Sequence, residues 1–387
     1  MTAVERVVQA LRDRGVNWIA TLCGHGLDPF FQAAKRAGLR LVDTRNEQSA
    51  AYMADAYARL TGRLGVCAVS SGVAHVNALT GVANAWFDGA PLLLVSGSAA
   101  FVTAGMGHFQ DMPQAAIAAP ITKYAREIDC AERSWQILEE AAEHALSLPC
   151  GPVHLTFPMD VQKTEVSHFV QPVSTNAPAR TAATPLLPQC ERPLIVAGSR
   201  LFYAGASGEM LDFAERHAIP VVVPIWDRAA INRRSEVFMG VLGAASGGPK
   251  LLADADCIIL AGAATDYRVG FLQPGAIRPD ARIMHVLHGW KEARAGDYGD
   301  WLEEAQRRRT EFRASIERTA AQQAAQGTHA VHIIDAIRRV TPEDSVLLID
   351  GGSIGQWAHQ LLCDRYPEHW LTCGASGVVG WGLGGAC

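Results

Sequence analysis

Five short apolar runs punctuate residues 17–157, and a longer amphipathic or alanine-rich segment separates each run from the next. Strand-length runs that alternate with helix-length segments are typical of successive βαβ units. Because helices cover both faces of a parallel sheet, its strands read as continuous hydrophobic stretches. The pattern therefore predicts an α/β fold that opens with a parallel-sheet domain. The five runs read WIATL, LRLVD, GVCAVS, PLLLVSG and PVHLTF.

A second α/β series follows a polar stretch from about Gln162 to Pro188, which is rich in Pro, Ser, Thr and Ala and predicts a linker. A charged helix over Trp301–Gln326 then leads to a third set of elements. This set is too short to fold alone, so we expect it to dock on a partner or to continue beyond this sequence. The second series has strands PLIVAG, PVVVP, CIILAG and RIMHV, and the third has a helix over His329–Val340, a strand over Ser345–Asp350 and a helix over Ser353–Cys363.

Composition narrows the class of function. The formal net charge is -5, and no long charged run offers a surface for nucleic acid or anionic lipid. No apolar run could span a bilayer, and residues 1–14 have the pattern of an amphipathic helix. The nine cysteines form no C-x-x-C pair, so we expect reduced core thiols and a cytoplasmic protein that acts on small molecules.

The loops after the strands are the first candidates for a site, because ligands of open parallel sheets bind beyond the carboxyl ends of the strands. Gly24, His25 and Gly26 follow the run WIATL, and Asp28 with Pro29 predicts a helix N-cap and first turn there. Glycines let the backbone approach a ligand closely, although an ordinary tight turn has the same composition.

Glu47 lies in the first turn of the helix that is predicted to run to Gly62, where the helix dipole favours an acid. The string Asp43-Thr44-Arg45-Asn46-Glu47, with the alanines, Tyr57, Arg59 and Gly62 after it, closely resembles the glutamate helix of thiamine diphosphate-dependent enzymes. The resemblance continues through Ser70-Ser71-Gly72, Asn77, Phe109-Gln110 and Gly151-Pro152-Val153. The branch that it indicates is that of acetolactate synthase and benzaldehyde lyase.

The resemblance implies three domains. Residues 1–165 resemble the family's pyrimidine-binding domain, residues 185–326 a Rossmann-like central domain, and residues 327–387 the start of a diphosphate-binding domain. In the last of these, Asp350-Gly351-Gly352-Ser353-Ile354 resembles the first phosphate-contacting turn, and backbone amides at a helix start suit an anion. Gly377-Val378-Val379-Gly380 resembles the turn beside the aminopyrimidine.

Site residues follow from the resemblance, position by position. Glu47 and Gln110 are the implied catalytic residues: the glutamate hydrogen-bonds the aminopyrimidine, and the amide faces the reacting group. A glutamate whose pKa is raised by burial suits a weakly basic ring nitrogen. The implied cofactor-binding residues are Gly24, Glu47, Ser71, Asn77, Gly352, Ser353, Ile354, Gly377 and Val379, and the substrate pocket consists of His25, Gly26, Phe109 and Gln110.

The implied cofactors are thiamine diphosphate and Mg²⁺. The family's Gly-Asp-Gly and asparagine metal ligands are expected after Cys387, so no metal ligand is assigned within this chain. Where the family commonly has paired aspartates, this chain has His285-Val286-Leu287-His288, which argues against flavin. The pairs His285/His288 and His329/His332 have no third ligand and read as surface histidines.

The implied activity is carboligation or lysis on 2-oxo acids or aldehydes, as in acetolactate synthase. His25 stands one residue before the position of the benzaldehyde lyase histidine, where this chain has Gly26, and the family's Gly-Pro-Gly is replaced at Val73 and Ala74. The alternative is a non-catalytic or partner-dependent remnant of the family, and the glycine-rich end from Gly380 also mimics a dinucleotide fingerprint. A homodimer or homotetramer is expected, with the active site between subunits.

Overall fold

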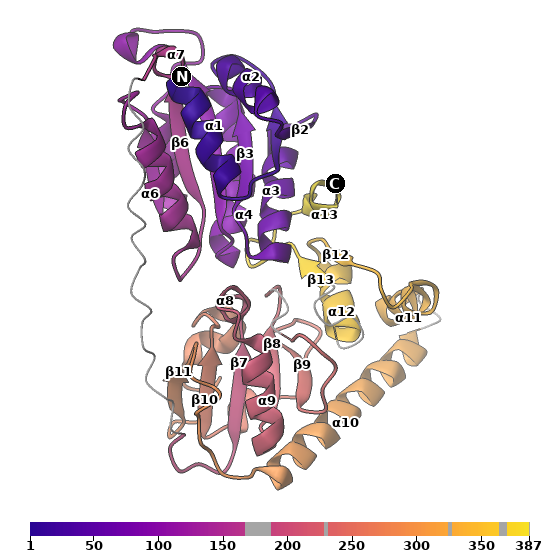
Figure 1. Cartoon of the computed structure of the whole chain (residues 1–387). Coiled ribbons are helices and arrows are strands. Elements are labelled where there is room, and N and C mark those ends of the chain that lie inside the picture. Colours follow the sequence, from indigo (N-terminus) through magenta and orange to yellow (C-terminus); the bar gives the residue numbers. More distant parts are fainter. Residues whose placement is uncertain (167–186, 228–230, 324–326, 364–369, 387) are drawn as a thin grey trace. The chain divides into compact units, whose positions relative to one another are not determined.

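The computed structural model describes residues 1–166, 187–227, 231–323, 327–363 and 370–386. Its internal contacts divide the chain into two compact units (Figure 1). The first unit comprises Met1–Pro178 and Gly380–Cys387, and the second comprises Ala179–Val379. Most of the expected linker over 162–188, namely residues 167–186, lies outside the described residues. Its first two residues, Gln162 and Lys163, belong to a helix that ends at Lys163. The three-domain division remains a prediction.

The first unit is a six-stranded parallel sheet in the order β2-β1-β3-β4-β6-β5, and the sequence predicted the parallel sheet and five of its strands. Its strands are Trp18–Leu22 (β1), Arg40–Asp43 (β2), Gly65–Val69 (β3), Leu92–Ser98 (β4), Tyr124–Glu127 (β5) and Val153–Pro158 (β6). Its helices are Ala3–Asp13 (α1), Asp28–Arg36 (α2), Glu47–Thr61 (α3), Val73–Asp88 (α4), Gln114–Ala118 (α5), Ser134–Leu146 (α6), Met159–Lys163 (α7) and Trp381–Gly385 (α13), with short 3-10 turns at Phe101–Thr103 and Ala119–Ile121.

Local signals explain where several of these helices begin and end. Thr2 and Glu5 form a reciprocal capping box at the start of α1. Asn46 caps α3 by accepting a hydrogen bond from the Gln48 amide, and α3 ends at Gly62, which has a φ of 68°. The expected N-cap of α2 was displaced by one residue, because Leu27 occupies that position and Asp28 is the first helical residue.

The two faces of the first sheet differ in chemistry. On the face packed by α1, α2 and α6, the core is apolar and includes Leu93, Leu155 and Phe157. On the opposite face, Cys67 of β3 pairs in register with Leu94 of β4. The next positions on this face of β4 and β6 carry the polar residues Ser96, His154 and Thr156. Ser96 Oγ lies 2.8 Å from His154 Nε2, and the His154 ring lies 4.5 Å from that of His75 on α4. This face buries polar side chains.

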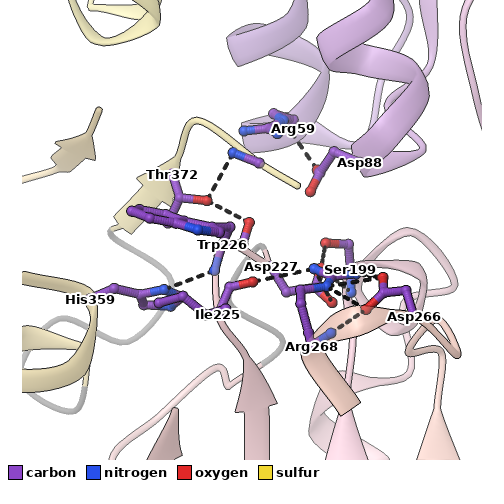
Figure 2. Close-up of polar contacts among 11 residues, drawn as sticks. Arg59, Asp88, Ser199, Ile225, Trp226, Asp227, Asp266, Arg268, His359 and Thr372 are labelled. Carbon is purple, nitrogen blue, oxygen red and sulfur yellow. Dashed lines mark hydrogen bonds and ion pairs between the residues drawn. The ribbon is translucent and has the colours of Figure 1, made fainter. Parts of the chain in front are cut away.

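A buried ionic cluster lies between α3, α4 and α13 in the first unit. Arg59 contacts Asp88 at 3.1 Å (Figure 2) and Asp55 at 3.4 Å, and its guanidinium lies over the Trp381 ring. Asn84 Nδ2 and Trp381 Nε1 both donate hydrogen bonds to Asp55. Burial raises the pKa of Asp55 to about 6, although Arg59 opposes the shift. The last helix of the chain is therefore held on α3 by polar contacts as well as by packing.

The second unit contains a five-stranded parallel sheet in the order β11-β10-β7-β8-β9 and a smaller parallel pair, β12 and β13. The strands are Pro193–Ala197 (β7), Val221–Pro224 (β8), Phe238–Leu242 (β9), Cys257–Ala261 (β10), Arg282–His285 (β11), Leu347–Ile349 (β12) and Trp370–Thr372 (β13). The helices are Ser199–Tyr203 (α8), Ser207–His217 (α9), Gly299–Gln323 (α10), Ala330–Val340 (α11) and Ser353–Leu362 (α12), with 3-10 turns at Leu252–Asp254 and Tyr267–Leu272.

The short third set of elements docks within the second unit, around the end of β8 (Figure 2). The Trp226 amide donates to His359 Nδ1 on α12 at 3.1 Å, and the Thr372 hydroxyl donates to the Trp226 carbonyl. Burial lowers the pKa of His359 to about 3, so this imidazole is neutral and can accept from the amide. Two buried hydrogen bonds therefore fix β13 and α12 to the loop after β8.

Several features of the fold escaped the sequence. Strands β5 and β9 were missed; β5 reads YARE, a half-exposed edge strand with no apolar run, and β9 contains Gly240. The expectation that cysteines are core thiols was wrong for four of the eight described, because Cys23 is exposed and Cys130, Cys150 and Cys190 are half-buried. All eight are free thiols.

Candidate functional site

The predicted residues of the first unit gather at the carboxyl edge of its sheet. His25 follows β1, Ser71 follows β3, and Gln110 lies in the loop after β4. Ser71 Oγ donates to Gln110 Oε1 at 2.9 Å and lies 3.0 Å from His25 Nδ1. The Phe109 ring meets the His25 ring edge to face at 5.4 Å. The sequence thus named four residues that the fold brings into contact.

The hydrogen bonds of Ser71 indicate which ring nitrogen of His25 faces it as a donor. Ser71 has one hydroxyl proton, and it donates that proton to Gln110. Ser71 must therefore accept from His25, which carries its proton on Nδ1. His25 Nε2 makes no hydrogen bond to a described residue and remains available to another group. This ring is half-buried, and its neighbour Phe109 is 70% exposed.

Glycines in this cluster allow close backbone contacts. A Cβ on Gly26, whose φ is 93°, would lie 2.9 Å from the Ser98 amide nitrogen, and a Cβ on Gly97 would lie 2.4 Å from the Gly26 carbonyl carbon. A Cβ on Gly72, whose φ is 57°, would lie 2.6 Å from the Gln110 carbonyl oxygen. Gln110 itself has a φ of 59°, in the left-handed region that non-glycine residues rarely adopt. The loops are held in one arrangement that larger residues would disturb.

Two buried amides that the sequence did not single out hold these loops. The Gln114 side chain accepts from the Gly72 amide at 2.6 Å and donates to the Gly97 carbonyl at 2.8 Å. The Gln162 side chain donates to the Gly26 and Phe157 carbonyls. Neither glutamine belongs to a local pattern; each is recognised only when loops far apart in sequence are seen to share it.

Glu47 and Asn77 form a second pair in the first unit. Glu47 is the first residue of α3 and half-buried, and Asn77 Nδ2 on α4 donates to its Oε2 at 3.0 Å. No other described residue hydrogen-bonds the Glu47 carboxylate. Burial of the Cys67 thiol on β3, and to a smaller extent the charge of Glu47, raise the pKa of Cys67. A carboxylate oxygen therefore remains available for a ligand at the start of α3.

The predicted residues of the second unit lie on two turns that touch each other. A Cβ on Gly351 would lie 3.0 Å from the Val378 carbonyl oxygen and 3.1 Å from the Gly377 carbonyl oxygen. Gly352, with a φ of 102°, precedes the first residue of α12, Ser353. The side chains of Ile354 and Val379 are 44% and 75% exposed. Both turns therefore present backbone groups and an uncovered apolar surface.

The predicted site residues thus form three groups: the His25, Ser71, Phe109 and Gln110 cluster with Gly24 and Gly26, the Glu47 and Asn77 pair, and the two turns that carry Gly352–Ile354 and Gly377–Val379. Within the described ranges, no three His, Cys, Asp or Glu side chains converge as a metal site. No helix in those ranges is long and apolar enough to cross a membrane.

Comparison with known proteins gives two family matches. Residues 1–117 match the family described as thiamine pyrophosphate enzyme, N-terminal TPP binding domain, and residues 180–294 match thiamine pyrophosphate enzyme, central domain. The acetolactate synthase large subunit IlvG of Mycobacterium tuberculosis is 27% identical over 426 aligned positions, covering 99% of this chain and 75% of that protein. Human 2-hydroxyacyl-CoA lyase 2 is 28% identical, covering 98% and 71%. The acetolactate synthase large subunit of Lactococcus lactis subsp. lactis is 27% identical, covering 97% and 71%.

Proposed function

The chain belongs to the thiamine pyrophosphate-dependent enzymes, and from this premise we propose that it is a carboligase or lyase that acts on 2-oxo acids or aldehydes. The similarity to acetolactate synthase large subunits and to 2-hydroxyacyl-CoA lyase extends over nearly the whole chain. The observation that carries the proposal at the level of residues is Glu47, half-buried at the start of α3 with one carboxylate oxygen uncommitted.

The side chains and backbone fit the two ends of thiamine diphosphate. Glu47 offers a half-buried carboxylate, whose charge acts on the buried Cys67 of β3, for a hydrogen bond to an aminopyrimidine nitrogen. The turn at Gly352 and the start of α12 offer amides to a diphosphate. Val379, exposed next to that turn, is the proposed apolar support of the cofactor. When bound, thiamine diphosphate supplies a carbon nucleophile that adds to carbonyl groups.

Glu47 is the proposed proton-handling residue on the cofactor side. A carboxylate at the first helical position is held by the positive end of the α3 dipole, and the Asn77 amide fixes its orientation. A glutamate in this setting can share a proton with a ring nitrogen, which a glutamine cannot do. Asn77 is then a positioning residue for Glu47.

Gln110 and His25 are proposed to act on the substrate side. The Gln110 amide NH₂ is a donor that can hydrogen-bond a substrate oxygen, because its Oε1 is already engaged by Ser71. His25 can take up or return a proton at Nε2. Gly24 and Gly26 allow backbone approach, and Phe109 offers an apolar wall over His25. These residues suit a small polar carbonyl compound.

Self-association belongs to the same proposal. On α4, the side chains of Val73, Val76 and Phe87 are 59%, 40% and 57% exposed and recur at helical spacing. Such a stripe is unfavourable in water unless it is covered. We assign a second copy of this chain as its cover, in a homodimer or homotetramer whose active site lies between subunits, as the family resemblance implies.

Magnesium and location complete the proposal. Mg²⁺ would accompany the diphosphate, with ligands outside this chain as the resemblance implies. Flavin is not part of the proposal. A cytoplasmic location agrees with the eight described cysteines, all of which are free thiols.

The deciding experiment is calorimetric titration of the full chain with thiamine diphosphate, with and without Mg²⁺, together with turnover of pyruvate. Because the Mg²⁺ ligands are expected outside this chain, we expect weak binding by the chain alone. Where turnover is measured, a Glu47→Gln variant should lose it by about 100-fold or more. Glu143→Gln, an exposed carboxylate on α6, is the matched control and should keep full turnover. Absence of binding and of turnover would support the alternative of a non-catalytic or partner-dependent family member.

A further inference from the structure

Two cysteines meet at the amino-terminal edge of the five-stranded sheet, away from the loops considered above. Cys190 precedes β7 by three residues, and Cys257 is the first residue of β10, opposite Pro193 in register. The Asp256 carboxylate accepts hydrogen bonds from the Glu191 and Arg192 amides at 2.7 and 2.8 Å. This carboxylate fastens the segment of Cys190 beside Cys257. The Cys257 thiol lies within interaction distance of Cys190 and also donates to Met284 Sδ at 4.0 Å.

The two thiols differ in access. Cys257 is fully buried, whereas Cys190 is half-buried and lines a cavity of about 950 Å³. The same cavity is lined by Arg192, Arg294 and Tyr298. A small molecule in the cavity can therefore reach the Cys190 sulfur but not the Cys257 sulfur.

The surroundings also make the two thiols differ in acidity. The contact with Cys257 lowers the pKa of Cys190 against the effect of burial, and Tyr298, whose Oη lies 3.4 Å from Cys190 Sγ, adds to this. The same contact, and then burial, raise the pKa of Cys257. Cys190 is thus the more accessible and the more readily deprotonated of the two thiols, which is the combination of an attacking and a resolving cysteine.

We propose that Cys190 and Cys257 form a redox modification site, at which a hydroperoxide converts the two thiols into a disulfide. The Cys190 thiolate attacks the peroxide oxygen, the O–O bond breaks, and a sulfenic acid forms on Cys190 while hydroxide leaves. The Cys257 sulfur then attacks Cys190 Sγ, and the sulfenic hydroxyl leaves as water. In total, two thiols give up two electrons and two protons, and hydrogen peroxide becomes two molecules of water.

The disulfide would tie the entry of β7 to the start of β10. These cysteines are 67 positions apart (257 minus 190), so the bond closes a long loop and restricts the unfolded chain. We expect the melting temperature of the second unit to rise by about 5 °C or more on oxidation. The site is independent of the proposed carboligase activity, because it lies at the opposite edge of the strands from the loops that follow them.

The test is peptide mapping of the full chain by mass spectrometry, after a stoichiometric dose of hydrogen peroxide at neutral pH and alkylation of the remaining thiols. We expect one linked peptide pair containing Cys190 and Cys257, lighter by two hydrogen atoms and reversed by dithiothreitol. In Cys257→Ala, oxidation should stop at a sulfenic acid on Cys190, which dimedone traps. The matched control is Cys23→Ser, which removes an exposed thiol whose raised pKa disfavours reaction and should leave the link unchanged.

A second variant tests the role of the phenol without removing a sulfur. Tyr298→Phe loses the hydroxyl beside Cys190 and should slow trapping of the sulfenic acid several-fold at neutral pH, with unchanged circular dichroism. The proposal is overturned if Cys190 is oxidised without a link to Cys257, or if Cys23 is consumed before Cys190. It is equally overturned if Tyr298→Phe reacts at the parent rate.

Discussion

The two faces of the first sheet belong to the same strands, yet they bury different kinds of side chain. The face under α1, α2 and α6 is filled by aliphatic and aromatic side chains and needs no partner groups. The face under α3 and α4 buries His75, His154 and Thr156 together with the Asp55 and Arg59 cluster. Both ring nitrogens of His75 and the Thr156 hydroxyl have no hydrogen-bond partner among the described residues.

The difference follows the position of the proposed site. Helices α3 and α4 carry Glu47 and Asn77, so the polar face lies behind the residues that would meet the cofactor. Apolar burial contributes to stability without direction, whereas buried hydrogen bonds and ion pairs fix the relative position of two helices. We infer that the apolar face holds the domain together and that the polar face sets the geometry of α3 against α4.

The largest expected effect comes from breaking the ionic cluster. Arg59→Met leaves Asp55 and Asp88 buried without their cation, and the first unit should lose about 3–5 kcal/mol of unfolding free energy. Urea denaturation measures the loss. The double variant Arg59→Met/Asp88→Leu should recover part of it, because one of the two buried carboxylates is removed as well. A loss below about 1 kcal/mol in the single variant would mean that the cluster is not buried in solution.

A cavity on the apolar face should be somewhat less damaging. Leu155 is almost fully buried in the core under α6, and Leu155→Ala should lower the unfolding free energy by about 3 kcal/mol. The size of this loss should be the same at pH 5 and pH 8, because no titratable group is involved. A loss that varies with pH by more than about 1 kcal/mol would show that the two faces are coupled.

Of the two faces of the first sheet, only the polar face should lose stability when the pH is lowered. Burial lowers the pKa of His75 to about 4 and places that of His154 well below its usual value. The unfolded chain therefore binds protons below about pH 6.5 that the folded chain refuses, so this contribution is complete above pH 6.5 and lost as the pH falls towards 4.

For His75 alone, we expect about 2 kcal/mol less stability at pH 5 than at pH 8. Asp55 acts in the opposite sense, since its raised pKa favours the folded state at low pH. The measurement is therefore the difference between parent and His75→Leu in urea denaturation across this range. Parallel pH curves for the two proteins would refute the assignment of His75 as a buried neutral imidazole.

Close packing between α3 and α4 should have a smaller effect. A Cβ on Gly81 would lie 2.4 Å from the Ala51 Cβ, so Gly81→Ala should push the helices apart and cost about 1–2 kcal/mol. Because Glu47 and Asn77 lie on these two helices, turnover should fall by more than the loss of stability explains. Unchanged turnover would separate the α3 and α4 geometry from the proposed site.

The smallest effect on stability is expected for the exposed apolar residues of α4, the helix that packs on the polar face. Phe87→Ser should change the unfolding free energy of the monomer by no more than about 0.5 kcal/mol, because this ring is largely exposed. Analytical ultracentrifugation should show self-association at least tenfold weaker, which corresponds to about 1.4 kcal/mol. An unchanged assembly would place the interface elsewhere on the chain.

The sequence by itself determined the parallel α/β architecture, because fully buried strands must be apolar throughout and helices must show one apolar face. It also determined the helix that begins at Glu47 and ends at Gly62, since the Asn46 cap and the left-handed glycine are local signals. The string around Glu47 was enough to indicate the family, which the comparisons bear out. The roles of the individual site residues stay predictions.

Only the tertiary structure decided which distant groups contact each other. Gln114, Gln162 and the thiol pair of Cys190 and Cys257 carry no pattern in the sequence, because each depends on partners up to 136 residues away. The edge strand β5 was missed for a related reason, since its pairing with β6 is formed by backbone groups that any residue possesses. Local chemistry predicts elements, whereas contacts between elements depend on packing that no short window of sequence contains.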